Sequence, residues 1–163
     1  LIWNDTKIRY KSIPNALFVL TGKNFLSERG NSKALLNSFN ESNNCIWLQG
    51  VPHDEMVKWY QVSDIALIPS LWPEGMSMAS IEAMASGLVP VTNRVAAIPE
   101  FVDDDCGILA EPEDVNGIVD GIRKLYNDPD LFLKLSKNAG LRARRQSGFD
   151  ETILKEIEII KNK

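Results

Sequence analysis

Short apolar runs alternate with segments of helical periodicity along most of the chain. The runs typical of buried strands are residues 16–20, 46–48, 65–68, 88–91 and 107–110. Helical spacing of apolar positions marks residues 33–39, 55–62 and 78–86, and Gly87 follows the last of these segments. The alternation predicts an α/β fold, Rossmann-like, with a doubly wound parallel sheet of about five or six strands and helices on both faces.

The last third of the chain continues with helical patterns alone. They cover residues 115–126, 129 to about 149 and 150 to about 160, and another helix is expected at residues 6–12. We expect the C-terminal helices to pack outside the sheet of a single domain over residues 1–163.

The composition fits a folded domain that does not bind nucleic acid. The 163 residues are 44% hydrophobic, which suffices for one core. The 18 basic and 22 acidic residues give a net charge of −4, which provides no basic field for a nucleic acid. The apolar runs are shorter than the roughly 18 to 20 residues of a membrane span, and no signal-peptide layout is evident, so we expect a cytoplasmic protein. Cys45 and Cys106 lie far apart and are interpreted as reduced thiols.

Residues 69–87 combine the features expected of a ligand site. Doubly wound sheets bind ligands beyond the carboxyl ends of their strands, and this segment joins a strand to an almost wholly apolar helix. Glu74 lies in the loop and Glu82 in the helix, where a buried carboxylate costs about 2 to 7 kcal/mol unless it is hydrogen-bonded. A pair of ribose hydroxyls would satisfy Glu82.

The start of the same helix is the expected anion site. Gly75 permits close backbone approach, Ser77 is a candidate N-cap, and the helix is expected to begin near Met78. Unpaired N–H groups of the first turn, at the positive end of the helix dipole, suit a diphosphate. Glu74 would then accept hydrogen bonds from sugar hydroxyls.

Glu74 and Glu82 are separated by seven residues, and characteristic segments surround them. These segments are ALFVLTG, IWLQGVP, VKWYQVSDIALIPS, EAMASGLVPVTN and IPEFVDDDCGILAEPED. Together they resemble the E-x7-E signature and its context in the C-terminal, donor-binding domain of family-4 retaining glycosyltransferases with the GT-B architecture (glycosyl transferases group 1). The resemblance spans roughly residues 13–150.

The resemblance implies transfer of a hexose from a nucleoside diphosphate sugar, with retention, to a hydroxyl acceptor in polysaccharide or glycolipid synthesis. It implies neither a cofactor nor a metal ion. It assigns Glu74 to the sugar hydroxyls as the catalytic residue and Glu82 to the ribose. The backbone positions that it assigns to the diphosphate and sugar are Gly75, Met76, Ser77 and Met78. The base would lie near Val51 and Pro52, and the candidates for lining the pocket are Gly22 and Trp72.

GT-B enzymes have two facing Rossmann-like domains, and the N-terminal one holds most of the acceptor. We expect this chain to be a fragment without that domain, and therefore inactive in transfer when isolated. We expect the full-length enzyme to bind a saccharide or lipid-linked acceptor and to associate peripherally with a membrane.

Two features depart from the family pattern. The chain has Gly75, Met76 and Ser77 where the family commonly has Gly-Phe-Gly, which makes the loop backbone less permissive and leaves sugar specificity open. The Arg and Lys that neutralise the pyrophosphate in the family have no clear counterpart here. The basic residues Lys7, Arg9 and Lys11 fall on an expected helix.

The residues leave other functions to weigh. A sugar-nucleotide epimerase of the same architecture would need acid–base residues that we do not locate, and a non-catalytic nucleotide-binding module would not need them. A glycosidase would use Glu74 and Glu82 as its carboxylate pair, at a separation of either about 5 Å or about 6.5 to 9.5 Å. The run Asp103, Asp104 and Asp105 is disfavoured as a metal site because adjacent side chains diverge.

Overall fold

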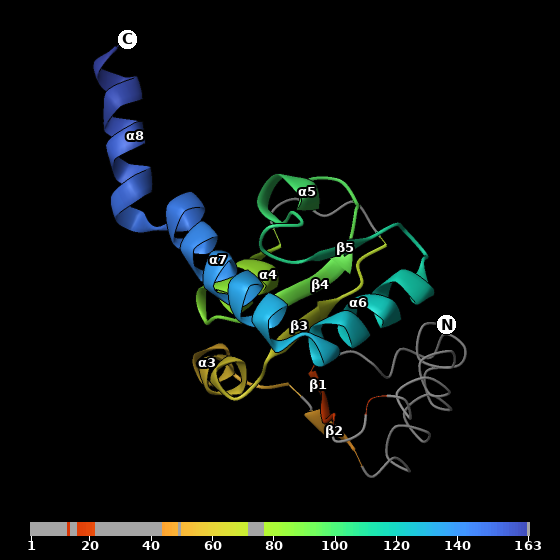
Figure 1. Cartoon of the computed structure of the whole chain (residues 1–163). Coiled ribbons are helices and arrows are strands. Elements are labelled where there is room, and N and C mark those ends of the chain that lie inside the picture. Colours follow the sequence, from red (N-terminus) through yellow and green to blue (C-terminus); the bar gives the residue numbers. More distant parts are fainter. Residues whose placement is uncertain (1–12, 14–15, 22–43, 49, 72–76, 163) are drawn as a thin grey trace. The chain divides into compact units, whose positions relative to one another are not determined.

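The computed structural model describes residue 13 and residues 16–21, 44–48, 50–71 and 77–162. Strands and helices alternate through this part of the chain (Figure 1). The elements are β1 (Phe18–Thr21), β2 (Cys45–Leu48), α3 (His53–Gln61), β3 (Ile65–Ile68), α4 (Met78–Ala85), β4 (Val89–Asn93), α5 (Ile98–Phe101), β5 (Ile108–Ala110), α6 (Val115–Asn127), α7 (Pro129–Ser147) and α8 (Phe149–Lys161). The expected helices at residues 6–12 and 33–39 lie outside the described residues.

All described strand pairs are parallel, as the alternation predicts. The chain divides into two compact units, Leu1–Met56 and Val57–Lys163. In the first unit β1 pairs with β2, from Phe18 opposite Cys45 to Thr21 opposite Leu48. In the second unit the strand order is β3-β4-β5. The prediction of an α/β fold with a parallel sheet is therefore confirmed.

Strand β4 is the centre of the second unit, and every one of its residues is buried. Its polar end stays in the ladder because the side chains of Thr92 and Asn93 each donate a hydrogen bond to a backbone carbonyl. The Thr92 hydroxyl donates to the carbonyl of Ile68 at 2.7 Å, and the Asn93 side-chain amide donates to the carbonyl of Glu111 at 2.8 Å. These bonds explain why the strand continues to Asn93, beyond the apolar run at residues 88–91.

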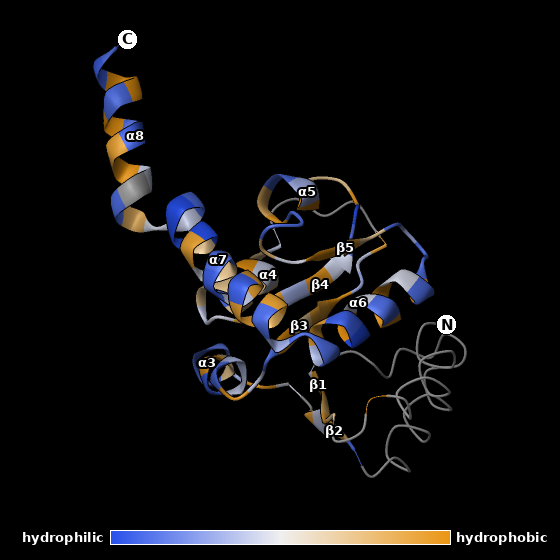
Figure 2. Cartoon of the chain, viewed as in Figure 1, coloured by the Kyte–Doolittle hydropathy of each residue, from blue (hydrophilic) through white to orange (hydrophobic). Residues whose placement is uncertain are grey.

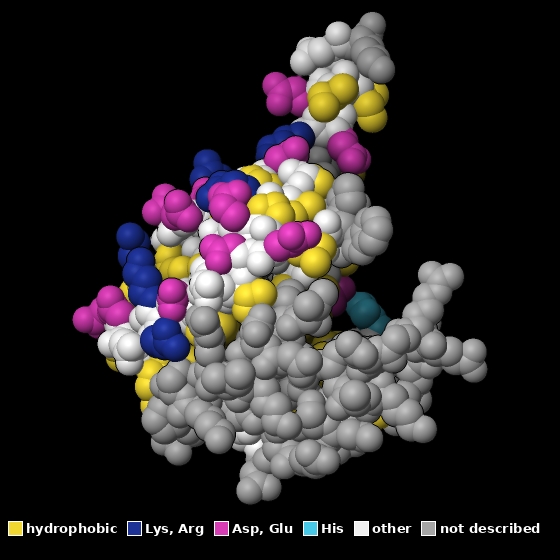
Figure 3. Space-filling view, turned by 90° about the vertical axis from the view of Figure 1, so that its right-hand side faces the viewer, with side chains coloured by type: hydrophobic (Ala, Val, Ile, Leu, Met, Phe, Trp, Pro, Cys, Tyr) yellow, Lys and Arg dark blue, Asp and Glu magenta, His cyan; other side chains and the backbone are white. Residues whose placement is uncertain are grey.

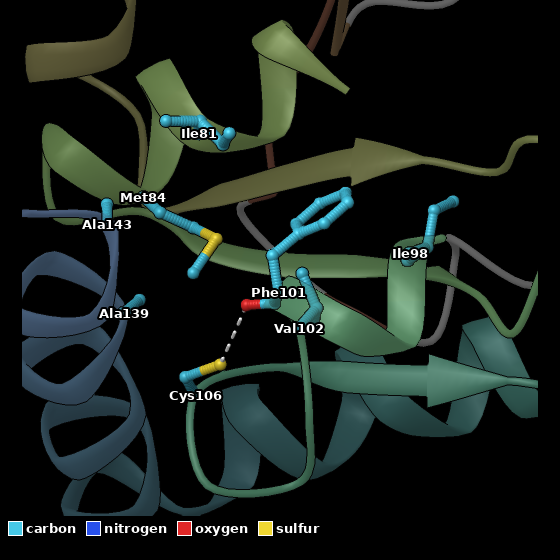
Figure 4. Packing of buried hydrophobic residues seen from close by; sticks show 8 residues of the cluster. All are labelled: Ile81, Met84, Ile98, Phe101, Val102, Cys106, Ala139 and Ala143. Atoms are coloured by element: carbon cyan, nitrogen blue, oxygen red, sulfur yellow. Dashed lines mark hydrogen bonds between the residues drawn. The ribbon is translucent and has the colours of Figure 1, made fainter. Parts of the chain in front are cut away.

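The core of the second unit lies where its helices meet the sheet. Val89 and Val91 of β4 pack with Ile118 of α6 and Leu135 of α7. A second cluster joins α4, α5 and α7 (Figure 4), and its buried members are Ile81, Met84, Ile98, Phe101, Val102, Cys106, Ala139 and Ala143. In this view the Met84 side chain extends from α4 toward Phe101 and Val102.

The sequence patterns predicted no element between residues 91 and 107, so helix α5 was not expected. Four residues are too few to show a helical period. Its two apolar residues, Ile98 and Phe101, lie three positions apart and are both buried. The pairing of these two side chains with the core explains why a single helical turn forms here.

Helix α8 contacts α7 and alternates hydrophobic and hydrophilic positions along its length (Figure 2). Several of its apolar side chains are exposed, among them Phe149, Leu154 and Ile160. On the face shown in Figure 3, acidic and basic side chains of the described residues are interspersed. Among these residues, no helix combines the length and apolarity that a membrane crossing needs.

Gly107 precedes β5 at a close approach of backbone segments. A Cβ atom at this position would lie 2.8 Å from the Pro90 carbonyl oxygen and from Val102 Cγ1. We expect Gly107→Ala to lower the free energy of unfolding by about 1 to 3 kcal/mol, because the Pro90 backbone does not yield easily.

Gly140 in α7 provides the matched control. It is also buried, but a Cβ atom there would meet only the Met84 carbonyl oxygen, at an ordinary 3.5 Å. Gly140→Ala should raise stability by up to about 1 kcal/mol through helix propensity. Urea unfolding of both variants measures the effects, and equal stability of the two would contradict the packing described at Gly107.

Candidate functional site

Helix α4 carries the described part of the predicted site. It begins at Met78, as predicted, and its buried residues are Ser80, Ile81, Ala83 and Met84. Its C-terminus closes with two backbone bonds, from the Leu88 N–H to the Ala83 carbonyl and from the Gly87 N–H to the Met84 carbonyl. Gly87 has a φ of +92°, a conformation that favours glycine. The sequence signal of Gly87 therefore marks the helix end correctly.

The side chain of the N-cap residue does not cap the N-terminus of α4. Ser77 is the N-cap residue, as predicted, but its hydroxyl makes no capping hydrogen bond. The Ser80 hydroxyl instead donates to the Ser77 hydroxyl at 3.1 Å, and both residues are buried. The first-turn amides therefore have no side-chain cap from Ser77 and remain at the positive end of the helix dipole, which is the arrangement that binds anions.

Glu82 lies at the side of α4 rather than on its buried face. The expectation of a buried carboxylate was wrong, because Glu82 is only half-buried while Ile81 and Ala83 beside it are buried. Its desolvation cost is lower than that of a fully buried carboxylate. The hydroxyl of Tyr60 on α3 donates to Glu82 Oε2 at 3.4 Å. The side chain thus combines a protein partner with access to solvent.

The contact with Glu82 also affects the pKa of the Tyr60 hydroxyl. Its ring packs against the buried cluster of Ala66, Ala83 and Leu88. Burial raises the pKa of the Tyr60 hydroxyl above the ordinary value of 10.0, and the charge and hydrogen bond of Glu82 raise it further. The hydroxyl therefore keeps its proton near neutral pH and remains a donor to the carboxylate.

The acidic run that follows α5 takes part in an ion pair. Arg142 of α7 donates to the carboxylate of Asp103, which also accepts the Asp105 N–H at 3.1 Å. Partial burial alone would raise the pKa of Asp103, but the hydrogen bonds from Arg142 and Asp105 outweigh it and hold the pKa below its usual value. Within the described residues, no group of three or more His, Cys, Asp or Glu side chains is arranged to hold a metal ion.

Of the remaining predicted site residues, some lie in the described part of the chain and the others lie outside it. Val51 and Pro52 lie in the first unit just ahead of α3, where the Pro52 carbonyl accepts the Glu55 N–H at 3.0 Å. Met78 is exposed at the first position of α4. The predicted residues outside the described part of the chain are Gly22, Trp72, Glu74, Gly75 and Met76.

Comparison with known proteins identifies the family. The family model of the glycosyl transferases group 1 matches residues 4–145. The chain belongs to this family. A solved C-terminal domain of a glycosyl transferase group 1 family protein (LpcC) from Francisella tularensis aligns with a TM-score of 0.70 and 25% identity, over 86% of this chain and 73% of that one. The fold is therefore the Rossmann-like domain of GT-B glycosyltransferases, as the resemblance implied.

Two curated relatives are longer than this chain. An MMP alpha-(1->4)-mannosyltransferase of Mycolicibacterium hassiacum is 35% identical over 96 residues, which are 58% of this chain and 23% of the relative. A lipopolysaccharide 1,2-N-acetylglucosaminetransferase of Salmonella typhimurium is 30% identical over 125 residues, which are 71% of this chain and 32% of the relative. The match thus spans about a quarter to a third of each relative.

Two side-chain contacts of this group 1 domain could not be predicted from its sequence. Tyr60 and Glu82 lie 22 residues apart on different helices, and Asp103 and Arg142 lie 39 apart. Both pairs depend on how separate helices and loops pack, for which no local pattern gives a signal. An aromatic residue at helical spacing indicates burial, as Tyr60 shows, but it does not identify the partner of the hydroxyl.

Removal of the Glu82 charge should lower the pKa of Tyr60. In Glu82→Gln the Coulombic part of the upward shift disappears, while burial of the ring persists. We expect the tyrosine to titrate at lower pH than in the wild-type protein, which an NMR titration of 13C-labelled tyrosine measures. The raised folded-state pKa also means that wild-type stability falls as the pH rises above about 10. An unchanged Tyr60 titration in Glu82→Gln would contradict the contact.

Proposed function

We propose that the chain is the donor-binding part of a retaining hexosyltransferase that uses a nucleoside diphosphate sugar. The observation that carries this proposal is the combination on α4 of a helix N-terminus that Ser77 does not cap with its side chain and a half-buried carboxylate one turn further on. Membership of the glycosyl transferases group 1 supports it. The helix N-terminus suits a diphosphate, and the carboxylate suits the two hydroxyls of a ribose.

The diphosphate is proposed to bind at the first turn of α4. Amide N–H groups at a helix start point toward an anion, and the dipole adds a partial positive charge. The same groups would stabilise the negative charge that develops on the diphosphate as it leaves the anomeric carbon. The positions concerned are Gly75, Met76, Ser77 and Met78, and Glu74 is proposed to hold the sugar hydroxyls.

The ribose is proposed to bind at Glu82. A carboxylate accepts two hydroxyl donors in a bidentate arrangement, and its partial exposure leaves a ligand able to reach it. Tyr60, the partner at Glu82 Oε2, is a neutral donor and not a cation. The base is proposed to lie near Val51 and Pro52.

The relatives suggest the class of sugar and product. One transfers mannose and the other N-acetylglucosamine, the latter in lipopolysaccharide. We extend this to hexose transfer onto a saccharide or lipid-linked acceptor in polysaccharide or glycolipid synthesis. Donor binding without a metal ion or cofactor, and a cytoplasmic enzyme, belong to the same proposal.

Loss of the Glu82 carboxylate should weaken nucleotide binding. Hydrogen bonds to a charged group contribute about 1.5 to 3 kcal/mol, so we expect Glu82→Ala to raise the dissociation constant for the diphosphate that binds best by about tenfold or more. Isothermal titration calorimetry with UDP, GDP and ADP measures it.

Glu156 on α8 gives the control, because it is an exposed glutamate in the middle of a helix. Glu156→Ala removes the same charge and should leave the affinity unchanged. Equal affinity of the folded Glu82→Ala and wild-type proteins would remove the ribose assignment. A large loss of wild-type affinity on chelation of divalent ions would contradict the metal-free site.

A further inference from the structure

The Glu82 side chain needs an orienting contact if it is to receive a ribose. A half-buried glutamate on a helix surface has three rotatable side-chain bonds, and holding it in one rotamer costs conformational entropy. A binding site loses affinity whenever its acceptor must first be ordered by the ligand. A contact that orders the carboxylate in advance would therefore strengthen donor binding.

Tyr60 provides such a contact from a fixed position. Its ring packs against the cluster formed by Ala66 of β3, Ala83 within α4 and Leu88 beyond the end of α4. A ring with only two rotatable bonds, packed in this way, fixes where its hydroxyl lies. That hydroxyl donates to Glu82 Oε2, so the fixed ring restrains the carboxylate.

The chemistry of the pair leaves room for a ligand. A phenol hydroxyl donates one hydrogen bond, whereas an ionised carboxylate offers about four acceptor sites. Tyr60 is neutral, so it orients Glu82 without cancelling the charge that a ribose would meet. The O···O separation of 3.4 Å is long for a hydrogen bond, so the contact is a weak restraint by itself and relies on the packing of the Tyr60 ring.

We propose that Tyr60 is a positioning residue that holds the Glu82 carboxylate toward the two ribose hydroxyls of the donor nucleotide. This inference rests on the proposed donor site and deepens it. Tyr60 itself does not touch the ribose; it acts through Glu82. A purely structural tyrosine would instead stabilise the protein and affect all ligands equally.

The test is Tyr60→Phe, which keeps the ring and removes the hydroxyl. Affinities are measured by calorimetry for a ribonucleoside diphosphate and for its 2′,3′-dideoxy form, with UDP, GDP or ADP chosen by the strongest wild-type binding. We expect the substitution to weaken binding of the ribonucleotide by about three- to tenfold, since the bond is long and partly exposed. The affinity for the dideoxynucleotide should not change, because it lacks the hydroxyls that Glu82 holds.

Two further variants separate positioning from structure. Ser63→Ala removes a hydroxyl that donates to the Trp59 carbonyl at 2.7 Å just beyond α3, and it should leave both affinities unchanged. In the Glu82→Ala background, Tyr60→Phe should have no additional effect on ribonucleotide binding. Thermal unfolding confirms that each variant is folded.

The outcomes distinguish this inference from the proposed function. Equal weakening for both nucleotides, or unchanged ribonucleotide affinity in Tyr60→Phe, would overturn the positioning role while Glu82→Ala still reports on the donor site. If the wild-type protein binds none of the three diphosphates, the proposed function fails, and the role of Tyr60 fails with it.

Discussion

Burial of α4 between the sheet and α7 is the constraint on which the second unit depends. The helix contacts β3 and β4 as well as α7, and its apolar residues belong to two of the buried clusters. Ser136 of α7 also donates to the Gly87 carbonyl at 2.6 Å, just beyond the helix end. Because α4 is held by several elements, the groups at its N-terminus and side have fixed positions, which is what a binding site requires.

The same constraint separates structural from functional positions along α4. Side chains that face the sheet or α7 are apolar or small, and Ser80 there is satisfied by Ser77. Glu82 lies between these faces, where a carboxylate remains partly hydrated. Partial hydration lowers the cost of a charged residue in an otherwise apolar helix. The helix can be packed tightly and still present an acceptor to a ligand.

Sequence patterns predicted the architecture and the bounds of α4 because they depend on local chemistry. The run at residues 65–68 coincides with β3, and Gly87 marks the end of α4 through its positive φ. The burial of Glu82 was misjudged, because apolar neighbours in sequence do not show which way a side chain faces. Tyr60, Arg142 and α5 could not be predicted, since their roles depend on contacts between distant elements or on a single turn. The assignment of Glu74 remains a prediction from the family signature.

The central claim is that α4 is the donor site, with the diphosphate at its first turn and the ribose at Glu82. The most direct measurement is an NMR titration of the 15N-labelled protein with the nucleoside diphosphate that binds best. The account predicts the largest amide shift changes at Met78, Ala79 and Ser80, with smaller changes around Tyr60 and Glu82. Saturable changes confined to another surface, such as the surroundings of Asp103 and Arg142, would contradict it.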